Sequence, residues 1–175
     1  ELDWHTHHPT EENRWPFVWL YSERGSEGSK TSWINQVLAY NDLPKDIKEK
    51  VNEITVACGH KVGNFSPSEI FQDHIIYDNP QKIVRTNIEN LTGLYFPFLQ
   101  IFDIVEGATK EEWPELFEYL KNHILQEKYI MHHDWEDGDL VISEQWLSIH
   151  KRWTFADMKT RVLHRIALDY EHSYV

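Results

Sequence analysis

The sequence predicts a mixed α+β domain, mainly β, built on an antiparallel barrel or sandwich. Strand-like runs lie near both ends of the chain, and helical patterns lie between them. The 175 residues include 8 Trp, 8 Tyr and 8 Phe, which favours sheet over disorder. This length is enough for one core, so we expect a single domain over residues 1–175.

The first half of the chain should begin with a buried strand over residues 14–21 (RWPFVWLY), in which Pro16 marks an edge or bend. Residues 31–43 have apolar side chains at helical spacing, after a Gly28–Thr31 loop that supplies a capping hydroxyl. Pro44 opens a second helical pattern. The run at residues 55–58 predicts a buried strand, which makes Cys58 a small core residue.

The middle of the chain contains the clearest helical pattern, over residues 109–128, with Thr109 as its cap. Short strands are expected at residues 82–86 and 93–98. Residues 64–80 form a polar, proline-containing connection that predicts irregular structure and a candidate lid. Four strands should follow the helix, with a turn at Gly138-Asp139 between the first two: residues 129–135, 140–144, 146–152 and 161–170.

Charge and cysteine content limit which partners and which cellular location we expect. The chain has 17 basic and 29 acidic residues, a formal charge of −12, so nucleic acid and anionic membranes are poor partners. It has no apolar run near the ~20 residues of a membrane span, and no basic-then-apolar leader. The single cysteine, Cys58, excludes an internal disulfide, so we expect a reducing, cytoplasmic location. The aromatic content leaves room for an apolar interface in a homo-oligomer.

Histidines are the main chemical signal. His5 and His7 are two residues apart, so on a strand both would project to one face and could bind one metal ion. A third ligand has to come from elsewhere. His132-His133 and His150 both lie on predicted strands, and periodicity does not choose between them.

Four motifs resemble the taurine and 2,4-dichlorophenoxyacetate dioxygenase family. Residues 4–7 (WHTH) are similar to that family's Trp-His-Thr-Asp, which holds iron. Residues 23–43 are similar to its Gly-rich segment and Thr-x-Trp, and residues 135–142 to its Trp-x-x-Gly-Asp turn. Residues 147–165 resemble its distal histidine and arginine segment. Order and spacing agree from residue 4 to residue 170.

The resemblance implies a double-stranded β-helix (jelly-roll) core with flanking helices, and it assigns site residues. His5 and His150 match the iron histidines, which chooses His150 over the His132-His133 pair. Thr31 matches a hydroxyl that contacts 2-oxoglutarate, and Arg161 matches the arginine that pairs with its distal carboxylate. Arg165, on the same strand face as Arg161, would contact substrate or form a structural ion pair.

The activity implied is that of an Fe(II)/2-oxoglutarate-dependent dioxygenase, which hydroxylates a small-molecule substrate with O2. The family's N-terminal portion, which precedes the first iron histidine, has no counterpart here, so we expect that it is missing. One ligand also departs from the pattern, because His7 stands where the family has a carboxylate.

The exchange at position 7 leaves three hypotheses open. The first is a metal site of His5, His7 and His150, which we favour. The second is a three-histidine oxygenase that does not use 2-oxoglutarate. The third is a non-catalytic binding domain that kept the fold.

Overall fold

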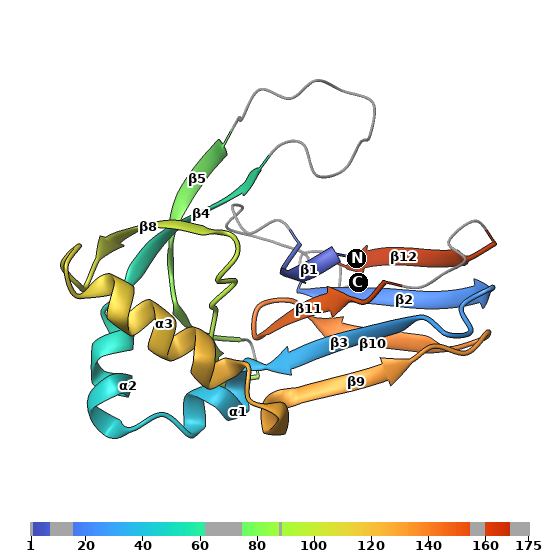
Figure 1. Ribbon diagram of the computed structural model, residues 1–175, viewed down its shortest axis with the longest axis horizontal. Helices are drawn as coiled ribbons and strands as arrows, with labels where there is room; N and C mark the ends of the chain where they lie inside the picture. Colours follow the sequence, from blue (N-terminus) through green and yellow to red (C-terminus); the bar gives the residue numbers. More distant parts are fainter. Residues whose placement is uncertain (1, 8–15, 62–74, 88, 155–159, 169–175) are drawn as a thin grey trace.

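The strands of the protein form antiparallel sheets, and few helices accompany them. This arrangement confirms the predicted mainly β class. The structure is a computed structural model that describes residues 2–7, 16–61, 75–87, 89–154 and 160–168. In Figure 1 two sheets lie together on one side, and the helices lie with the remaining sheets on the other.

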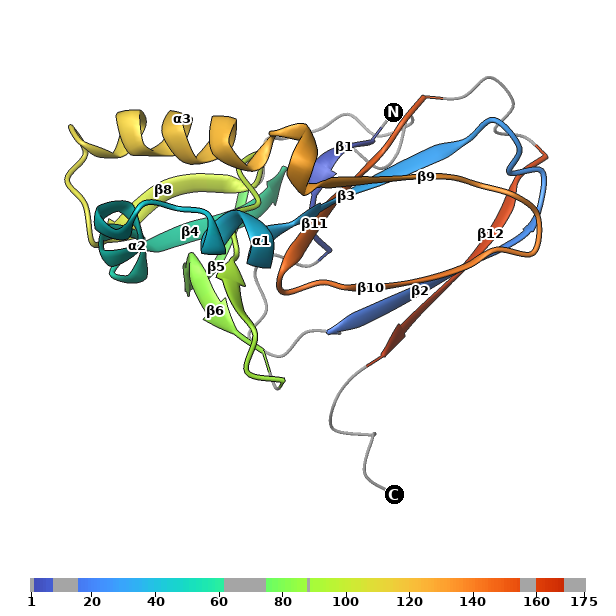
Figure 2. The same ribbon diagram turned by 90° about the horizontal axis from the view of Figure 1, so that it is seen from below.

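Of the two sheets that lie together, one has four strands and the other has three. The four-stranded sheet has the order β1-β11-β3-β9: β1 (Leu2–His5), β11 (Ser148–Arg152), β3 (Lys30–Asn35) and β9 (Ile130–Asp134). The other, which we call the facing sheet, has the order β10-β2-β12: β10 (Leu140–Glu144), β2 (Phe17–Arg24) and β12 (Val162–Leu168). A hairpin turn at Gly138, whose φ is 94°, joins β9 to β10 (Figure 2).

Strand register determines which side chains face the space between these sheets. On β3 and β11, Thr31 lies opposite Arg152 and Trp33 lies opposite His150. Because side chains two residues apart share a face, all four project to the same side. Arg165 on β12 lies opposite Leu20 on β2 and projects from the facing sheet.

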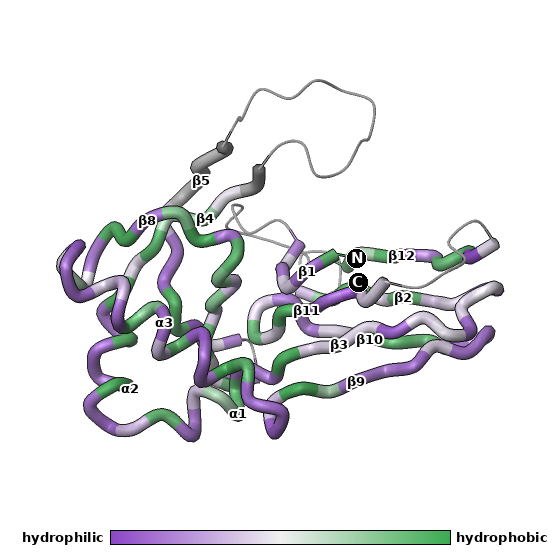
Figure 3. The backbone as a smooth tube through the Cα atoms, viewed as in Figure 1, coloured by the Kyte–Doolittle hydropathy of each residue, from purple (hydrophilic) through white to green (hydrophobic). Residues whose placement is uncertain are grey.

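The hydrophobic core lies on the other side of the four-stranded sheet. Ile34 and Ile149 belong to one buried cluster with Leu120 and Ile124 of α3 (Trp113–Ile124). The remaining elements complete this half of the molecule: α1 (Gln36–Asn41), α2 (Lys45–Asn52), β4 (Thr55–Lys61), β5 (Ile75–Lys82), β6 (Val84–Thr86), β7 (Thr92–Leu94), β8 (Ile101–Glu106) and the 3₁₀ turn η1 (Glu127–Tyr129). Hydrophobic and hydrophilic residues alternate along α3, as an amphipathic helix requires (Figure 3). Among the described residues, no helix is both long and apolar enough to cross a membrane.

The helix predicted from residue 31 is wrong in its first part, because β3 occupies residues 30–35. Thr31 and Trp33 pair with β11 and β9 on either side, and this pairing outweighs the helical spacing of the apolar residues. The helix α1 begins only at Gln36, and its cap is Asn35, whose side chain accepts hydrogen bonds from two backbone N–H groups, rather than Thr31.

The other predicted helices are present, although their ends move. Helix α2 follows Pro44 as expected. Helix α3 begins at Trp113 rather than at residue 109, and Thr109 caps the turn that leads into it: Thr109 Oγ1 accepts from the Glu112 backbone N–H, and the Glu112 carboxylate accepts from the Thr109 backbone N–H. It ends at Ile124.

The predicted strands agree with the structure better than the predicted helices do. β2, β4 and the four C-terminal strands occupy parts of their predicted ranges, and Cys58 is buried. The irregular connection predicted over residues 64–80 is wrong in its last part, because β5 begins at Ile75 and contains Pro80. Residues 64–74, which make up most of the candidate lid, lie outside the described residues. β8 has no counterpart in the predicted pattern.

Candidate metal and co-substrate site

Three histidines meet between the two sheets. His5 on β1 lies opposite His150 on β11, and His7 follows just beyond the end of β1. Ring centroids are 4.2 Å apart for His5 and His150, 4.6 Å for His7 and His150, and 5.4 Å for His5 and His7. One ring nitrogen of each lies within 4.8 Å of those of the other two, which suits three ligands of one ion.

The chain fixes the ring orientation of His5. Its Nδ1 lies 2.7 Å from the backbone carbonyl of Asp3, so Nδ1–H is the donor and the Nε2 atom carries the lone pair. Asp3 is itself held in place, since its carboxylate accepts from the backbone N–H of Trp4 and lies 3.2 Å from the Lys151 ammonium. A backbone partner behind a histidine is the arrangement typical of metal ligands.

His150 is kept neutral. Burial, followed by the proximity of His5, His7 and Arg165, holds the pKa of His150 well below its usual value. Its Nδ1 atom is buried and makes no hydrogen bond within the described part of the chain. A neutral imidazole with a buried, unpaired nitrogen is the form that binds a metal ion. The donor set therefore fits a divalent transition metal.

The alternative ligands suggested by the sequence do not reach this cluster. His133 Nε2 lies 3.0 Å from a carboxylate oxygen of Asp139. His132 projects to the opposite face of β9, where its ring forms hydrogen bonds with Ser32 Oγ at 2.6 Å and with the Glu127 carboxylate at 2.9 Å. The geometry thus groups His150, rather than the 132–133 pair, with His5 and His7.

A cavity of about 390 Å³ adjoins the three histidines, and both sheets contribute to its lining. It contains every residue that the sequence singled out for the site: His5, His7, Thr31, His150, Arg161 and Arg165. Its described lining has three arginines and no acidic residue, although the whole chain carries a charge of −12. Such a concentration of positive charge favours an anionic ligand.

Sequence reasoning missed the third arginine. Arg152 lies two residues after His150 on β11, so it shares the face of His150 and lines the cavity. Strand periodicity could have found it. Burial and the nearby Arg152 lower the pKa of Arg161, and burial lowers that of Arg165.

Trp135 was also missed as a site residue, although its motif was recognised. Its indole Nε1 donates to Thr31 Oγ1 at 2.9 Å, and the Arg161 guanidinium lies 5.7 Å from its ring centroid. Arg161 Nε also donates to Ser26 Oγ at 3.3 Å, which ties it to the glycine-containing loop before β3. The side chain of Trp135 is almost fully buried, so it contacts both residues from a fixed position.

Taken together, these features define a β-sheet protein with a candidate metal site, whose three imidazoles open onto a cationic cavity between two antiparallel sheets. The sequence profile of the taurine catabolism dioxygenase TauD, TfdA family matches residues 1–167. The chain belongs to this family. No match was found among the curated proteins.

Solved structures of similar fold agree with this assignment. AAD-2, in complex with Mn(II) and N-oxalylglycine, is 18% identical with a TM-score of 0.75, over 96% of this chain and 68% of that one. A taurine dioxygenase from Burkholderia xenovorans is 23% identical with a TM-score of 0.75, over 95% of this chain and 56% of its own. A putative alpha-ketoglutarate dependent 2,4-D dioxygenase from the same organism is 21% identical with a TM-score of 0.72, over 93% and 65%. The chain thus spans between 56% and 68% of the length of these proteins.

Proposed function

We propose that this chain is an Fe(II)/2-oxoglutarate-dependent dioxygenase domain that hydroxylates a small-molecule substrate with O2, and that its two facing sheets form a jelly-roll core. One observation carries the proposal: three imidazoles close enough to share an ion open onto the cavity that also contains Thr31 and Arg161. Membership of the TauD/TfdA family supports it.

In this proposal His5, His7 and His150 hold the iron. The hydrogen bond from His5 to the Asp3 carbonyl directs Nε2 into the cluster, and burial keeps His150 neutral. Bound iron would supply the activation of O2, coupled to oxidative decarboxylation of 2-oxoglutarate. The residues around it bind and orient the organic partners of that reaction.

Arg161 and Thr31 bind the 2-oxoglutarate. The Arg161 guanidinium pairs with the distal carboxylate, because its planar fork donates hydrogen bonds to both carboxylate oxygens at once. Thr31 Oγ1 already accepts the indole N–H of Trp135, so its own hydroxyl proton is available to donate to an anionic oxygen. Arg165, across the cavity on β12, contacts the substrate.

His7 supports one further candidate function. Three neutral ligands leave the site one unit more positive than two histidines and a carboxylate would. A three-histidine oxygenase, which binds its substrate directly on the metal without 2-oxoglutarate, also fits this ligand set. Oxygen uptake that does not depend on 2-oxoglutarate would distinguish it. A non-catalytic binding domain would bind no Fe(II), Mn(II) or Zn(II) in equilibrium dialysis at neutral pH.

The test is anaerobic titration of the Fe(II)-loaded protein with 2-oxoglutarate, followed by visible absorption. Chelation of the iron should give a weak charge-transfer band, and R161A should need at least tenfold more 2-oxoglutarate to reach it. R24A is the matched control, because Arg24 lies at the end of β2, is largely exposed and does not line the cavity. If iron is bound and the wild type gives no band, 2-oxoglutarate does not chelate the metal and the proposal is wrong.

A further inference from the structure

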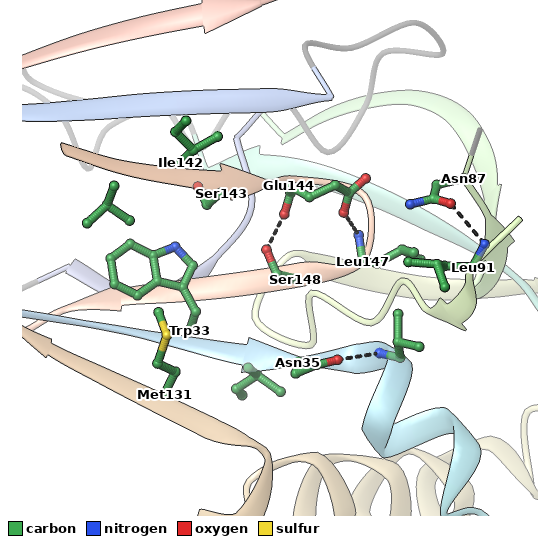
Figure 4. Close-up of a pocket in the computed structure, with 13 residues that line it drawn as sticks. Trp33, Asn35, Asn87, Leu91, Met131, Ile142, Ser143, Glu144, Leu147 and Ser148 are labelled. Carbon is green, nitrogen blue, oxygen red and sulfur yellow. Dashed lines mark hydrogen bonds between the residues drawn. The ribbon is translucent and has the colours of Figure 1, made fainter. Parts of the chain in front are cut away.

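A second cavity, of about 300 Å³, is lined by Trp33 and by none of the three histidines. It opens between β9 and β10, which are edge strands of the two facing sheets (Figure 4). Trp33 lines this cavity, whereas His150, which lies opposite Trp33 on the neighbouring strand, lines the first. None of the predicted metal or co-substrate residues lines the second cavity, so it is separate from the proposed active site.

Apolar side chains surround the opening of this cavity. Leu91, Met131 and Ile142 are each about half exposed, at 50%, 54% and 52%. Met131 and Ile142 come from the consecutive strands β9 and β10, Leu91 comes from a segment distant in the sequence, and all three line the same cavity. Single exposed apolar residues are common on proteins, but a ring of them around a concave site is typical of ligand binding.

Trp33 supplies a polar group to the cavity that lacks a partner. Its side chain is 5% exposed, and its indole Nε1 makes no hydrogen bond within the described part of the chain. The nitrogen lies on the edge of the ring that faces Ser143 and Ser148 in Figure 4. An indole N–H is a donor only and normally finds an acceptor when it is buried. A ligand with an acceptor would provide it.

Glu144 supplies the complementary group. One carboxylate oxygen accepts from the backbone N–H of Leu147 at 2.6 Å, which fixes the side chain at the turn after β10. The other oxygen is buried and makes no hydrogen bond within the described residues. Burial raises the pKa of this carboxyl to about 7. In Figure 4 Glu144 lies apart from Trp33, between it and the side chains of Asn87 and Leu91.

From these contacts we infer that the second cavity is a binding site for a compact, mainly apolar molecule, with a hydrogen-bond acceptor at one end for Trp33 Nε1 and a donor at the other for Glu144. The cavity volume of about 300 Å³ lies at the lower end of the range for ligand pockets, which favours a small ligand. An apolar body covers the half-exposed side chains, and its two polar ends satisfy the two buried atoms.

Three small probes test this inference: 4-aminoacetophenone, which has both polar ends, acetophenone, which lacks the donor, and 4-methylaniline, which lacks the acceptor. Affinities are measured by ligand-observed NMR or calorimetry on the chain without added metal, and the binding position is checked by soaking crystals. We expect 4-aminoacetophenone to bind in the second cavity, and each of the other two probes to bind at least threefold more weakly.

Two variants make the test specific. W33F keeps the ring but removes the N–H, so it should weaken 4-aminoacetophenone about fivefold and leave 4-methylaniline within twofold. W153F is the matched control, because Trp153 Nε1 donates to Ser32 Oγ at 2.8 Å on the opposite face of β3. S143F fills the cavity and should abolish binding of every probe. W33F then keeps the test valid even if S143F does not fold.

Three outcomes would overturn the inference. The first is no binding of any probe at millimolar concentration. The second is an equal loss of both amine probes in W33F, which would mean that the indole N–H contacts no acceptor. The third is electron density for the probe anywhere other than between β9 and β10. None of these outcomes depends on iron or 2-oxoglutarate, so they are independent of the proposed activity.

Discussion

The Trp135 indole N–H donates a 2.9 Å hydrogen bond to the hydroxyl of Thr31. Thr31 Oγ1 thereby accepts one hydrogen bond, and its hydroxyl proton remains available to donate to a ligand in the cavity. The same indole ring lies under the Arg161 guanidinium. Trp135 is therefore in contact with both residues that we propose bind 2-oxoglutarate, without lining the cavity itself.

Replacing Trp135 by Phe should weaken 2-oxoglutarate binding. The ring remains under Arg161, but the hydrogen bond to Thr31 is lost, which is worth about 1 kcal/mol, or roughly fivefold in affinity. Calorimetric titration of the Mn(II)-loaded protein measures this directly. W153F removes an equivalent bond to Ser32 on the other face of β3 and should leave the affinity unchanged. Equal losses in the two variants would show that Trp135 acts only through stability.

Gly25 allows the loop before β3 to approach Arg161. Its φ is +70°, and a Cβ atom built there would lie 2.7 Å from the carbonyl oxygen of Thr160 and 3.0 Å from the backbone nitrogen of Arg161. We expect G25A to displace the backbone at Arg161 and to lower both thermal stability and affinity for 2-oxoglutarate.

The G28A variant is the control that distinguishes the steric clash expected in G25A from the effect of a strained φ alone. Gly28 has a similar φ, +76°, but nothing within 4 Å of its Cβ position. Both variants should lose about 1 kcal/mol of folding free energy from the strained φ, and G25A should lose at least 1 kcal/mol more. Identical melting temperatures for the two variants would contradict the predicted clash.

His7 can be converted to the ligand that the family normally carries at this position. H7D adds a negative charge beside a divalent ion, so we expect at least tenfold tighter retention of Fe(II) or Mn(II) in equilibrium dialysis. H133A is the control, because His133 pairs with Asp139 outside the cluster. Unchanged metal affinity in H7D would mean that position 7 does not contact the ion.

Glu144 should make stability depend on pH. Burial raises the pKa of its carboxyl in the folded protein to about 7, above the ordinary value of 4.5, even though the backbone N–H groups of Leu147 and Trp146, and then Arg85, oppose the shift. The folded state therefore holds its proton more tightly, and stability is lost as pH rises from about 4.5 to about 7. E144Q, which keeps an acceptor for Leu147 N–H, should remove up to about 3 kcal/mol of this loss. Chemical denaturation at pH 5 and pH 8 tests this. A wild type and variant with parallel pH profiles would contradict it.

The sequence predicted the site better than the elements that carry it. The family resemblance assigned roles to His5, His150, Thr31 and Arg161, and the structure brings all four to one cavity. The helix predicted around Thr31 was wrong. The apolar residues of 31–43 have helical spacing, but pairing with β9 and β11 makes the first part of this segment a strand. Long-range pairing of this kind is not visible in local periodicity.

Contacts between distant segments account for the remaining omissions. The bond from Trp135 to Thr31 joins residues separated by 104 positions, so no local pattern could reveal it. The second cavity likewise brings Trp33 and Leu91 together with residues of β9 and β10. Arg152 is different, because its two-residue spacing from His150 was visible in the strand pattern.

We propose that the three histidines, together with Thr31 and Arg161, form one iron and 2-oxoglutarate site. A crystal structure of the protein with Mn(II) and 2-oxoglutarate, grown without O2, tests it most directly. We predict an ion bound by His5, His7 and His150, with the distal carboxylate of 2-oxoglutarate on Arg161 and an oxygen of the same molecule on Thr31. An ion held elsewhere, or 2-oxoglutarate bound away from Arg161, would contradict the claim.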